Sequence, residues 1–216
     1  MTKILYALIF ALTTISASAQ NYVSQRFIEG EQYSIVNNAI SSTNEIREYF
    51  SFYCPHCYNY EPFFHDIKEA IPKGIVFERN HVDFLRFTTK DMQYNLSKAM
   101  VVAKILGKEE DIVAAIFNYL HEQKSAFNNI GDIQSLFVAR GVAATDFNRL
   151  FKSKEVSDGA LKMQALQNYF TAKKGITSVP TVIINGKYRI NHSSLNRDHF
   201  AEEYLALVLY LLDLKQ

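Results

Sequence analysis

The spacing of apolar residues changes period along this chain of 216 residues. The first and last parts contain short apolar runs typical of buried strands, and a helical stretch separates two of them. From about Phe87 the period becomes 3.6 and stays helical for about eighty residues. This order predicts an α/β fold with an inserted all-helical subdomain. The expected strands are 32–36, 45–53, 75–83, 181–184 and 188–190, and the expected helices are 55–70, 91–106, 109–124, 132–140, 145–151, 154–174 and 194–214.

Several local signals mark the ends of these elements. Asn185-Gly186 lies between the last two expected strands and is the strongest hairpin signal in the chain. Gly107 and Gly175 follow helical patterns, and we expect each of them to end its helix. Pro62 lies inside 55–70, where its missing N–H and its ring predict a kink.

The N-terminal residues have the pattern of a secretory signal. Lys3 supplies a positive charge, 4–15 is a short apolar core, and the Ala-Ser-Ala sequence at 17–19 fits a cleavage site. The apolar run is too short to span a bilayer, and an uncleaved anchor is the alternative. We expect export into an oxidising compartment, where a disulfide can persist. The expected organisation is a signal peptide at 1–19, the first part of the main domain at 20–86, the helical subdomain at 87–167 and the second part of the main domain at 168–216.

Composition adds little to this picture. Hydrophobic residues make up 48% of the chain and the formal net charge is +1. This charge balance does not point to nucleic acid, so we expect no nucleic-acid partner.

The only two cysteines, Cys54 and Cys57, are spaced C-x-x-C between an apolar aromatic run and a segment that can open a helix. Pro55 suits the first turn of that helix, where a missing N–H costs nothing. A thiol at a helix N-terminus faces unpaired backbone N–H groups and the positive end of the helix dipole, which stabilise its thiolate. The arrangement is typical of a thioredoxin-like redox site.

Other uses of the two cysteines have weaker support. They could form an inert structural disulfide. C-x-x-C also begins zinc motifs, but a second pair is absent from the sequence and His56 is poorly placed to complete a chelate. A c-type haem site needs His directly after the second Cys, and Tyr58 occupies that position. We therefore expect no metal and no cofactor.

Glu48 is an acid set among large apolar residues in the expected central strand. Side chains alternate along a strand, so Glu48 shares a face with Ile46, Phe50 and Phe52 and has the same parity as Cys54. A carboxyl among large apolar neighbours should be desolvated, with its pKa raised. The alternative is a glutamate that is exposed at an edge or held in a salt bridge.

The segment 48–58, Glu-Tyr-Phe-Ser-Phe-Tyr-Cys-Pro-His-Cys-Tyr, resembles the active-site region of the DsbA family. Members of that family are bacterial periplasmic thiol:disulfide oxidases with a thioredoxin-like fold. The leader, Val179-Pro180 followed by Asn-Gly-Lys-Tyr at 185–188, and the long helical stretch also fit, so the resemblance covers essentially all of the mature chain. It implies a thioredoxin-like domain with a helical insertion, and a periplasmic enzyme that donates its disulfide to newly exported proteins during oxidative folding.

The resemblance also implies roles for individual residues. Cys54 would be the solvent-facing nucleophile and Cys57 its buried partner, with Pro55 and His56 setting the redox poise. Glu48 would be the buried acid associated with proton movement at Cys57.

One further segment matches the family, and one further position departs from it. Val179-Pro180 would form a cis-proline loop against the disulfide and bind an extended client segment. Arg79 stands where the family commonly has a lysine. Because Arg does not give up a proton as Lys can, a proton-relay role at Arg79 stays open.

The implied partners are unfolded exported proteins with cysteines and a quinone-linked membrane oxidase of the DsbB kind. We expect a monomer, since only about a dozen mature residues precede the first strand and no dimerisation region is visible in the sequence. A disulfide isomerase or reductase is one alternative. A redox-inactive peptide-binding module is another, although the intact cysteines argue against it.

Overall fold

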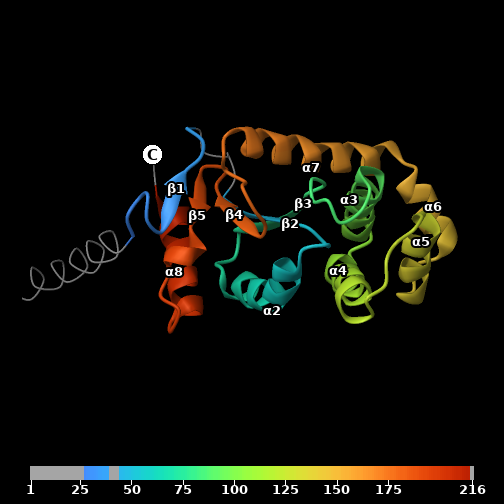
Figure 1. Cartoon of the computed structure of the whole chain (residues 1–216), viewed down its shortest axis with the longest axis horizontal. Helices are drawn as coiled ribbons and strands as arrows, with labels where there is room; N and C mark the ends of the chain where they lie inside the picture. The colour runs from blue at the N-terminus through green and yellow to red at the C-terminus, as the bar shows by residue number, and fades with distance from the viewer. Residues whose placement is uncertain (1–26, 39–43, 215–216) are drawn as a thin grey trace, which may run out of the picture.

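The structure is a computed structural model of the chain and describes residues 27–38 and 44–214 (Figure 1). The predicted signal peptide at 1–19 lies outside the described residues. Within the described ranges, the structure contains no helix that is both long and apolar enough to cross a membrane.

The described strands form one mixed sheet in the order β1–β5–β4–β2–β3. β2 runs parallel to β3 and antiparallel to β4, while β5 pairs antiparallel with both β4 and β1. A parallel pair needs a crossover connection, and helix α2 provides it between β2 and β3. The strands are β1 (Tyr33–Ile35), β2 (Glu45–Phe50), β3 (Val76–His81), β4 (Thr181–Ile184) and β5 (Tyr188–Ile190).

Helices α3 to α7 lie between β3 and β4 in sequence, as the change of period predicts. This confirms the expected fold class, a thioredoxin-like α/β domain with an all-helical insertion. The helical elements are α2 (Pro55–Ala70), α3 (Lys90–Ile105), α4 (Glu109–Phe117), the π-helical turn η1 (Asn118–Glu122), α5 (Ile130–Ala139), α6 (Ala144–Phe151), α7 (Lys154–Ala172), the 3₁₀ turn η2 (His192–Ser194) and α8 (Phe200–Asp213).

Helices cover both faces of the sheet. α2 and α8 lie on one side, where Phe64 and Leu207 pack around Ile46 of β2. On the other side the C-terminal part of α7 packs against β2, and the rings of Phe170 and Tyr49 lie 5.7 Å apart. α7 runs along the top of Figure 1 from the helical insertion to the sheet. The predicted subdomain boundary at 167 falls inside this continuous helix, so the division of domains stays a prediction.

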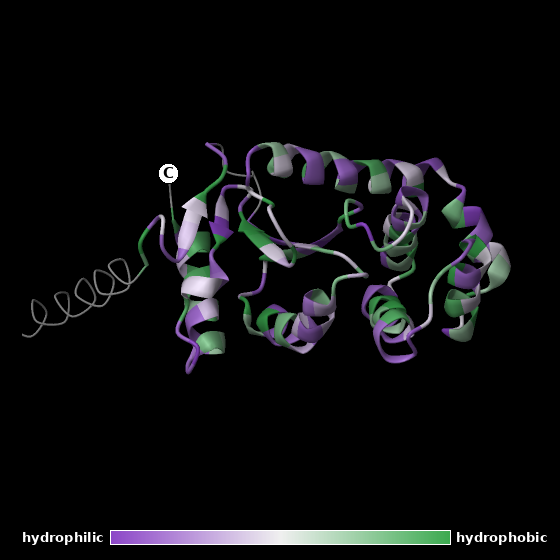
Figure 2. Cartoon of the chain, viewed as in Figure 1, coloured by the Kyte–Doolittle hydropathy of each residue, from purple (hydrophilic) through white to green (hydrophobic). Residues whose placement is uncertain are grey.

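The core of the helical insertion extends to the cysteines. Its cluster of buried side chains includes Phe117 and Phe137 together with Phe50, Cys54 and Cys57. Figure 2 shows hydrophobic residues on the sides of α3 and α4 that face the interior. The redox pair therefore lies where the insertion meets the sheet.

The expected central strand is three residues too long. β2 ends at Phe50, and a turn follows in which the Cys54 N–H donates to the Ser51 carbonyl at 3.0 Å. The Tyr53 N–H donates to the Ser51 hydroxyl at 3.2 Å. A serine side chain that bonds the nearby backbone competes with the sheet ladder, which explains the early end. Phe52 is nevertheless buried, with its ring 5.0 Å from that of Phe50.

The last helix begins later than expected, at Phe200 rather than at 194. Residues 192–194 form the 3₁₀ turn η2, and the polar side chains that follow bond the backbone of their own segment. The Asp198 N–H donates to Asn196 Oδ1 at 2.9 Å, and the Asn196 N–H donates to the Glu203 carboxylate. These local bonds replace helical ones.

The predicted roles of the turn residues hold at two sites and fail at a third. Asn185 and Gly186 have φ of 51° and 63°, the positive values that a type I′ hairpin needs, and Gly107 has φ of 63° after α3. At the end of α7 it is Lys174, not Gly175, that takes the left-handed conformation. Gly175 is instead needed for close packing, because a Cβ there would lie 3.2 Å from the Val36 Cβ.

Candidate active site

Cys54 is the N-cap of α2, as the C-x-x-C spacing predicts. Its backbone is extended, Pro55 follows at the first helical position, and the Cys57 backbone N–H donates to Cys54 Sγ at 3.4 Å. Both cysteines are free thiols in this structure. An acceptor at this position meets unpaired N–H groups and the positive end of the helix dipole, so a negative charge on Cys54 is favoured.

The two thiols have opposite acidities. The pKa of Cys54 is lowered to about 6, first by a hydrogen bond from the Cys57 thiol and then by the backbone N–H groups of Cys57 and His56, although burial opposes the shift. The pKa of Cys57 is raised far above its usual range, mainly by burial. Cys57 is 0% exposed, while Cys54 keeps 6% of its surface accessible. At neutral pH one sulfur is therefore an accessible thiolate and the other a buried thiol.

The Val179–Pro180 peptide bond is cis, and it lies against the cysteines. Cys54 Sγ lies 3.4 Å from the Val179 carbonyl, to which it donates when the thiol is protonated. The resemblance implies this conformation, which sequence alone does not favour, because only about 5–6% of X-Pro bonds are cis.

Glu48 is buried and is also held in a salt bridge, so both interpretations of the sequence apply together. It is 0% exposed, and Arg79 Nε donates to its Oε2 at 2.9 Å. Burial raises the pKa of Glu48 to about 7 and outweighs the opposing charge of Arg79. Glu48 Oε1 has no hydrogen-bond partner among the described residues. This carboxyl can therefore exchange a proton near neutral pH.

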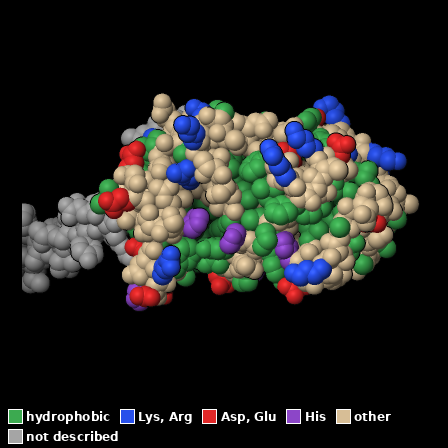
Figure 3. All heavy atoms as spheres, viewed as in Figure 1, with side chains coloured by type: hydrophobic (Ala, Val, Ile, Leu, Met, Phe, Trp, Pro, Cys, Tyr) green, Lys and Arg blue, Asp and Glu red, His purple; other side chains and the backbone are tan. Residues whose placement is uncertain are grey.

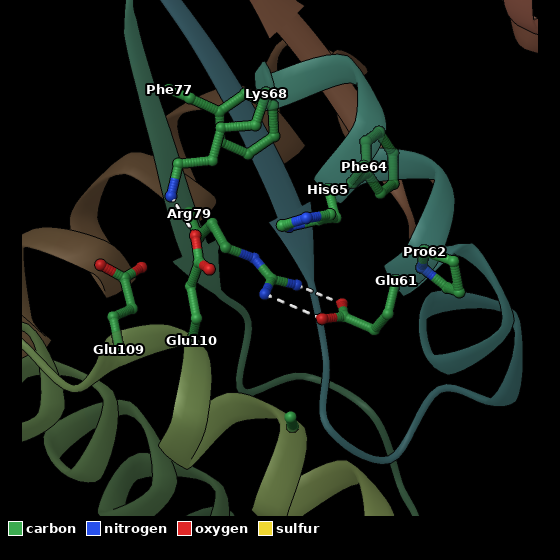
Figure 4. A pocket seen from close by; sticks show the side chains of 10 residues that line it. Glu61, Pro62, Phe64, His65, Lys68, Phe77, Arg79, Glu109 and Glu110 are labelled. Atoms are coloured by element: carbon green, nitrogen blue, oxygen red, sulfur yellow. Dashed lines mark hydrogen bonds and ion pairs between the residues drawn. The ribbon is translucent and has the colours of Figure 1, made fainter. Parts of the chain in front are cut away.

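Arg79 is held by two carboxylates. Besides Glu48, its guanidinium donates to both oxygens of Glu61, once at 3.1 Å and once through a shorter contact. Its Cζ also lies 4.3 Å above the centre of the Phe50 ring. Figure 4 shows Glu61 reaching toward Arg79 in a pocket of about 330 Å³ between α2, β3 and α4.

The structure places the remaining predicted residues in different surroundings. Pro55 and His56 are exposed on the first turn of α2, and the positive charge of His56 helps to lower the pKa of Cys54. Pro62 lies inside α2, which continues to Ala70. Figure 3 shows hydrophobic side chains in a band across the middle of the face seen there, with histidines among them.

Sequence reasoning missed Glu61. It lies four residues after Cys57, and residues four apart share one face of a helix, so the spacing was available as a signal. Its pairing with Arg79 depends on how α2 packs on β3, which spacing does not give. Among the described residues, three His, Cys, Asp or Glu side chains nowhere gather as they would to hold a metal ion.

Comparisons with known proteins agree with this geometry. The sequence model of the family described as Thioredoxin matches residues 34–200. The chain is 33% identical to the thiol:disulfide interchange protein DsbA of Pectobacterium carotovorum over 100% of both chains. It is 32% identical to that of Haemophilus influenzae over 98% of this chain and 99% of the relative.

Solved structures show the same fold. The disulfide oxidoreductase DsbA of Proteus mirabilis aligns with a TM-score of 0.76 and 28% identity, over 86% of this chain and 97% of the other. A complex of that protein with a non-covalently bound peptide aligns with a TM-score of 0.77 and 27% identity, over 86% and 98%.

The fold and the C-x-x-C site define a thioredoxin-like thiol:disulfide oxidoreductase. Within that class the chain belongs to the DsbA family of thiol:disulfide interchange proteins.

The acidity of Cys54 can be measured directly. We expect thiolate absorbance of the reduced protein to rise with a midpoint near pH 6, because the Cys57 thiol and the helix N–H groups stabilise the anion. Cys57 should stay unreactive toward alkylating agents in the folded state, because it is buried. Cys54→Ala is the control and should remove the transition. A midpoint near 9, the ordinary thiol value, would contradict this account.

The buried Glu48 should make stability depend on pH. The carboxyl loses its proton near 4.5 in the unfolded chain and near 7 in the fold. Between these values the folded state holds more protons at Glu48, so the contribution of Glu48 to stability falls as pH rises, by about 3 kcal/mol for a shift of this size. Glu48→Gln should remove this decline from denaturant unfolding curves of the oxidised protein, in which the cysteines do not titrate. The exposed Glu69→Gln should keep it, and parallel curves for all three proteins would contradict the prediction.

Proposed function

We propose that this enzyme is a periplasmic oxidase that donates its Cys54–Cys57 disulfide to newly exported proteins. The observation that supports oxidation of clients, rather than their reduction, is the difference in pKa between the Cys54 and Cys57 thiols. A thiolate stabilised at Cys54 lowers the free energy of the reduced enzyme, and whatever stabilises the reduced enzyme makes its disulfide more oxidising.

The reaction proceeds in two exchanges. A client thiolate attacks Cys54 Sγ, the Cys54–Cys57 bond breaks, and Cys57 leaves as a thiolate that takes up a proton. A second client thiolate then attacks the client sulfur bound to Cys54, which forms the client disulfide and releases the Cys54 thiolate. The client loses two electrons and the enzyme gains them. Cys54 is the attacked sulfur because it alone of the pair is accessible.

Glu48 is the group that supplies the proton to Cys57. Burial raises the pKa of Cys57 most, and the negative charge of Glu48 adds a smaller contribution. The pKa of Glu48 near 7 allows it to give and regain a proton at neutral pH. Arg79 stays charged between Glu48 and Glu61, so its role is to hold the carboxyl in place. Pro55 and His56 set the poise of the couple, His56 through its N–H and its charge.

Val179 and Pro180 bind the client. The contact of 3.4 Å between Cys54 Sγ and the Val179 carbonyl supports this role, because an extended client segment beside the sulfur could pair with the same backbone. Main-chain pairing tolerates many sequences, which suits an enzyme with many clients. The related Proteus mirabilis protein has been solved with the non-covalently bound peptide PWATCDS, which supports peptide binding in this family.

Each turnover leaves the enzyme reduced, so a partner must reoxidise it. The sequence holds only two cysteines, and we propose a quinone-linked membrane oxidase of the DsbB kind that presents a cysteine to Cys54. Membership of the DsbA family and the signal-like pattern at 1–19 support both this partner and the periplasmic location. We propose that the enzyme acts as a monomer.

A disulfide isomerase or reductase is the competing function, and a redox-inactive peptide-binding module is a third. Two assays, thiol oxidation and insulin reduction, distinguish these functions when they are applied to the wild type and to Cys54→Ala. An oxidase oxidises client thiols quickly and reduces insulin slowly, and both activities require Cys54. A module without redox function shows neither activity in either protein.

Trapping should identify the partners. In Cys57→Ala the mixed disulfide on Cys54 lacks its internal resolving thiol, so we expect covalent adducts to accumulate in the native host. The adducts should include exported proteins with cysteines and one integral membrane protein. Cys54→Ala is the matched control and should trap neither. If only soluble proteins are trapped, and membranes with quinone fail to reoxidise the enzyme, the assigned partner is wrong.

A further inference from the structure

The π-helical turn η1 of the helical insertion contacts the redox segment on both sides of the cysteines. His121 Nε2 lies 2.8 Å from the Phe52 carbonyl, two residues before Cys54. Because a carbonyl can only accept, Nε2 carries the hydrogen and donates it. The His121 ring also stacks on that of Tyr58, the residue after Cys57, with centroids 5.0 Å apart and planes 3° from parallel.

Glu122 completes this contact. The Tyr58 hydroxyl donates to Glu122 Oε1 at 2.7 Å. The turn is opened by one residue, since the Gln123 N–H donates to the Asn118 carbonyl five residues earlier. Such π turns inside helices are frequent at functional sites. We call His121 and Glu122, with their contacts to Phe52 and Tyr58, the η1 clasp.

His121 bonds a peptide unit whose orientation determines the type of the turn before Cys54. Residues 51–54 form a turn closed by the Cys54 N–H and the Ser51 carbonyl at 3.0 Å, so the Phe52–Tyr53 peptide is its central unit. The two common turn types differ by a flip of this central peptide. His121 holds the carbonyl of the peptide, and the Ser51 hydroxyl holds its N–H at 3.2 Å. A flip would break both bonds.

We propose that His121 is a positioning residue that sets the acidity of Cys54 and the redox equilibrium by fixing the Phe52–Tyr53 peptide from the helical insertion. The turn leads directly into Cys54, whose N-cap geometry brings Sγ to the Cys57 N–H at 3.4 Å. A loosened turn weakens this contact and destabilises the thiolate. The insertion, which supplies no cysteine, thereby helps to tune the couple.

The inference rests on the proposed role of Cys54 as the reactive sulfur. Titration of the wild-type thiolate tests that role alone, before any variant is compared. An ordinary thiol pKa for Cys54 in the wild type would contradict the proposed function. An acidic Cys54 whose pKa is unchanged by substitution of His121 would contradict only the proposed role of His121.

Two substitutions separate the donor from the ring. His121→Phe keeps an aromatic ring on Tyr58 and lacks the N–H, while His121→Gln keeps an N–H donor and lacks the ring. Cys54 titration and the equilibrium with glutathione are measured for each, with unfolding curves as a check of the fold. His199→Phe, at an exposed histidine before α8, is the matched control.

We expect His121→Phe to raise the pKa of Cys54 and to make the enzyme about fivefold less oxidising toward glutathione, the size of one hydrogen bond's net contribution. For a two-electron couple this is about 20 mV. His121→Gln should stay within about twofold of the wild type, and His199→Phe should equal it. The proposal is overturned if His121→Phe matches the wild type, or if the Phe and Gln variants shift alike.

A second pair keeps the test decisive if His121→Phe does not fold. His121→Asn carries the same amide as His121→Gln on a side chain one methylene shorter, so it should not reach the Phe52 carbonyl. We expect the Asn variant to be less oxidising than the Gln variant. Equal values for the two amides would overturn the proposal.

Discussion

A negative charge on Cys54 is held at the start of α2 by the Cys57 thiol and by backbone N–H groups, and the site is arranged around that charge. A helix dipole contributes at most about 2 kcal/mol, or roughly 1.5 pKa units. The lowering of the Cys54 pKa from 9.0 to about 6 is larger, so donors at hydrogen-bond distance are needed. These donors stay at hydrogen-bond distance from Cys54 Sγ only while the turn before Cys54 and the first turn of α2 keep their geometry. The acidity of Cys54 therefore depends on that local geometry.

The buried charge of Glu48 acts on the other sulfur, Cys57, by raising the pKa of its thiol beyond the effect of burial. Cys57 is reduced in a place where its thiolate is strongly disfavoured, so a proton must reach it. Glu48 is buried next to the same helix, and Arg79 offsets part of the cost of its charge without neutralising it, leaving a carboxyl with a pKa of about 7. Because Arg79 is also bound to Glu61 of α2, the carboxyl, the helix and β3 are tied together.

Local pattern predicted much of this structure. α2 and the last two strands have the expected bounds, and the C-x-x-C spacing with Pro55 predicted the N-cap of Cys54. Burial of Glu48 followed from alternation along β2, but its salt bridge depends on the register between β2 and β3, in which Glu48 lies opposite Arg79. The end of β2, the start of α8 and the clasp at His121 were not predicted, because side chains that bond nearby backbone or a distant carbonyl leave no periodic signal.

The central claim is that the fold stabilises the Cys54 thiolate, and unfolding of the reduced and oxidised proteins against pH tests it most directly. In the reduced form the folded Cys54 loses its proton near 6 and the unfolded one near 9, so the fold holds fewer protons between these values. The stabilisation is complete above pH 9 and is lost as pH falls through 6. We therefore expect the reduced form to gain stability relative to the oxidised form as pH rises through this window. A difference between the two forms that does not change with pH would contradict the account.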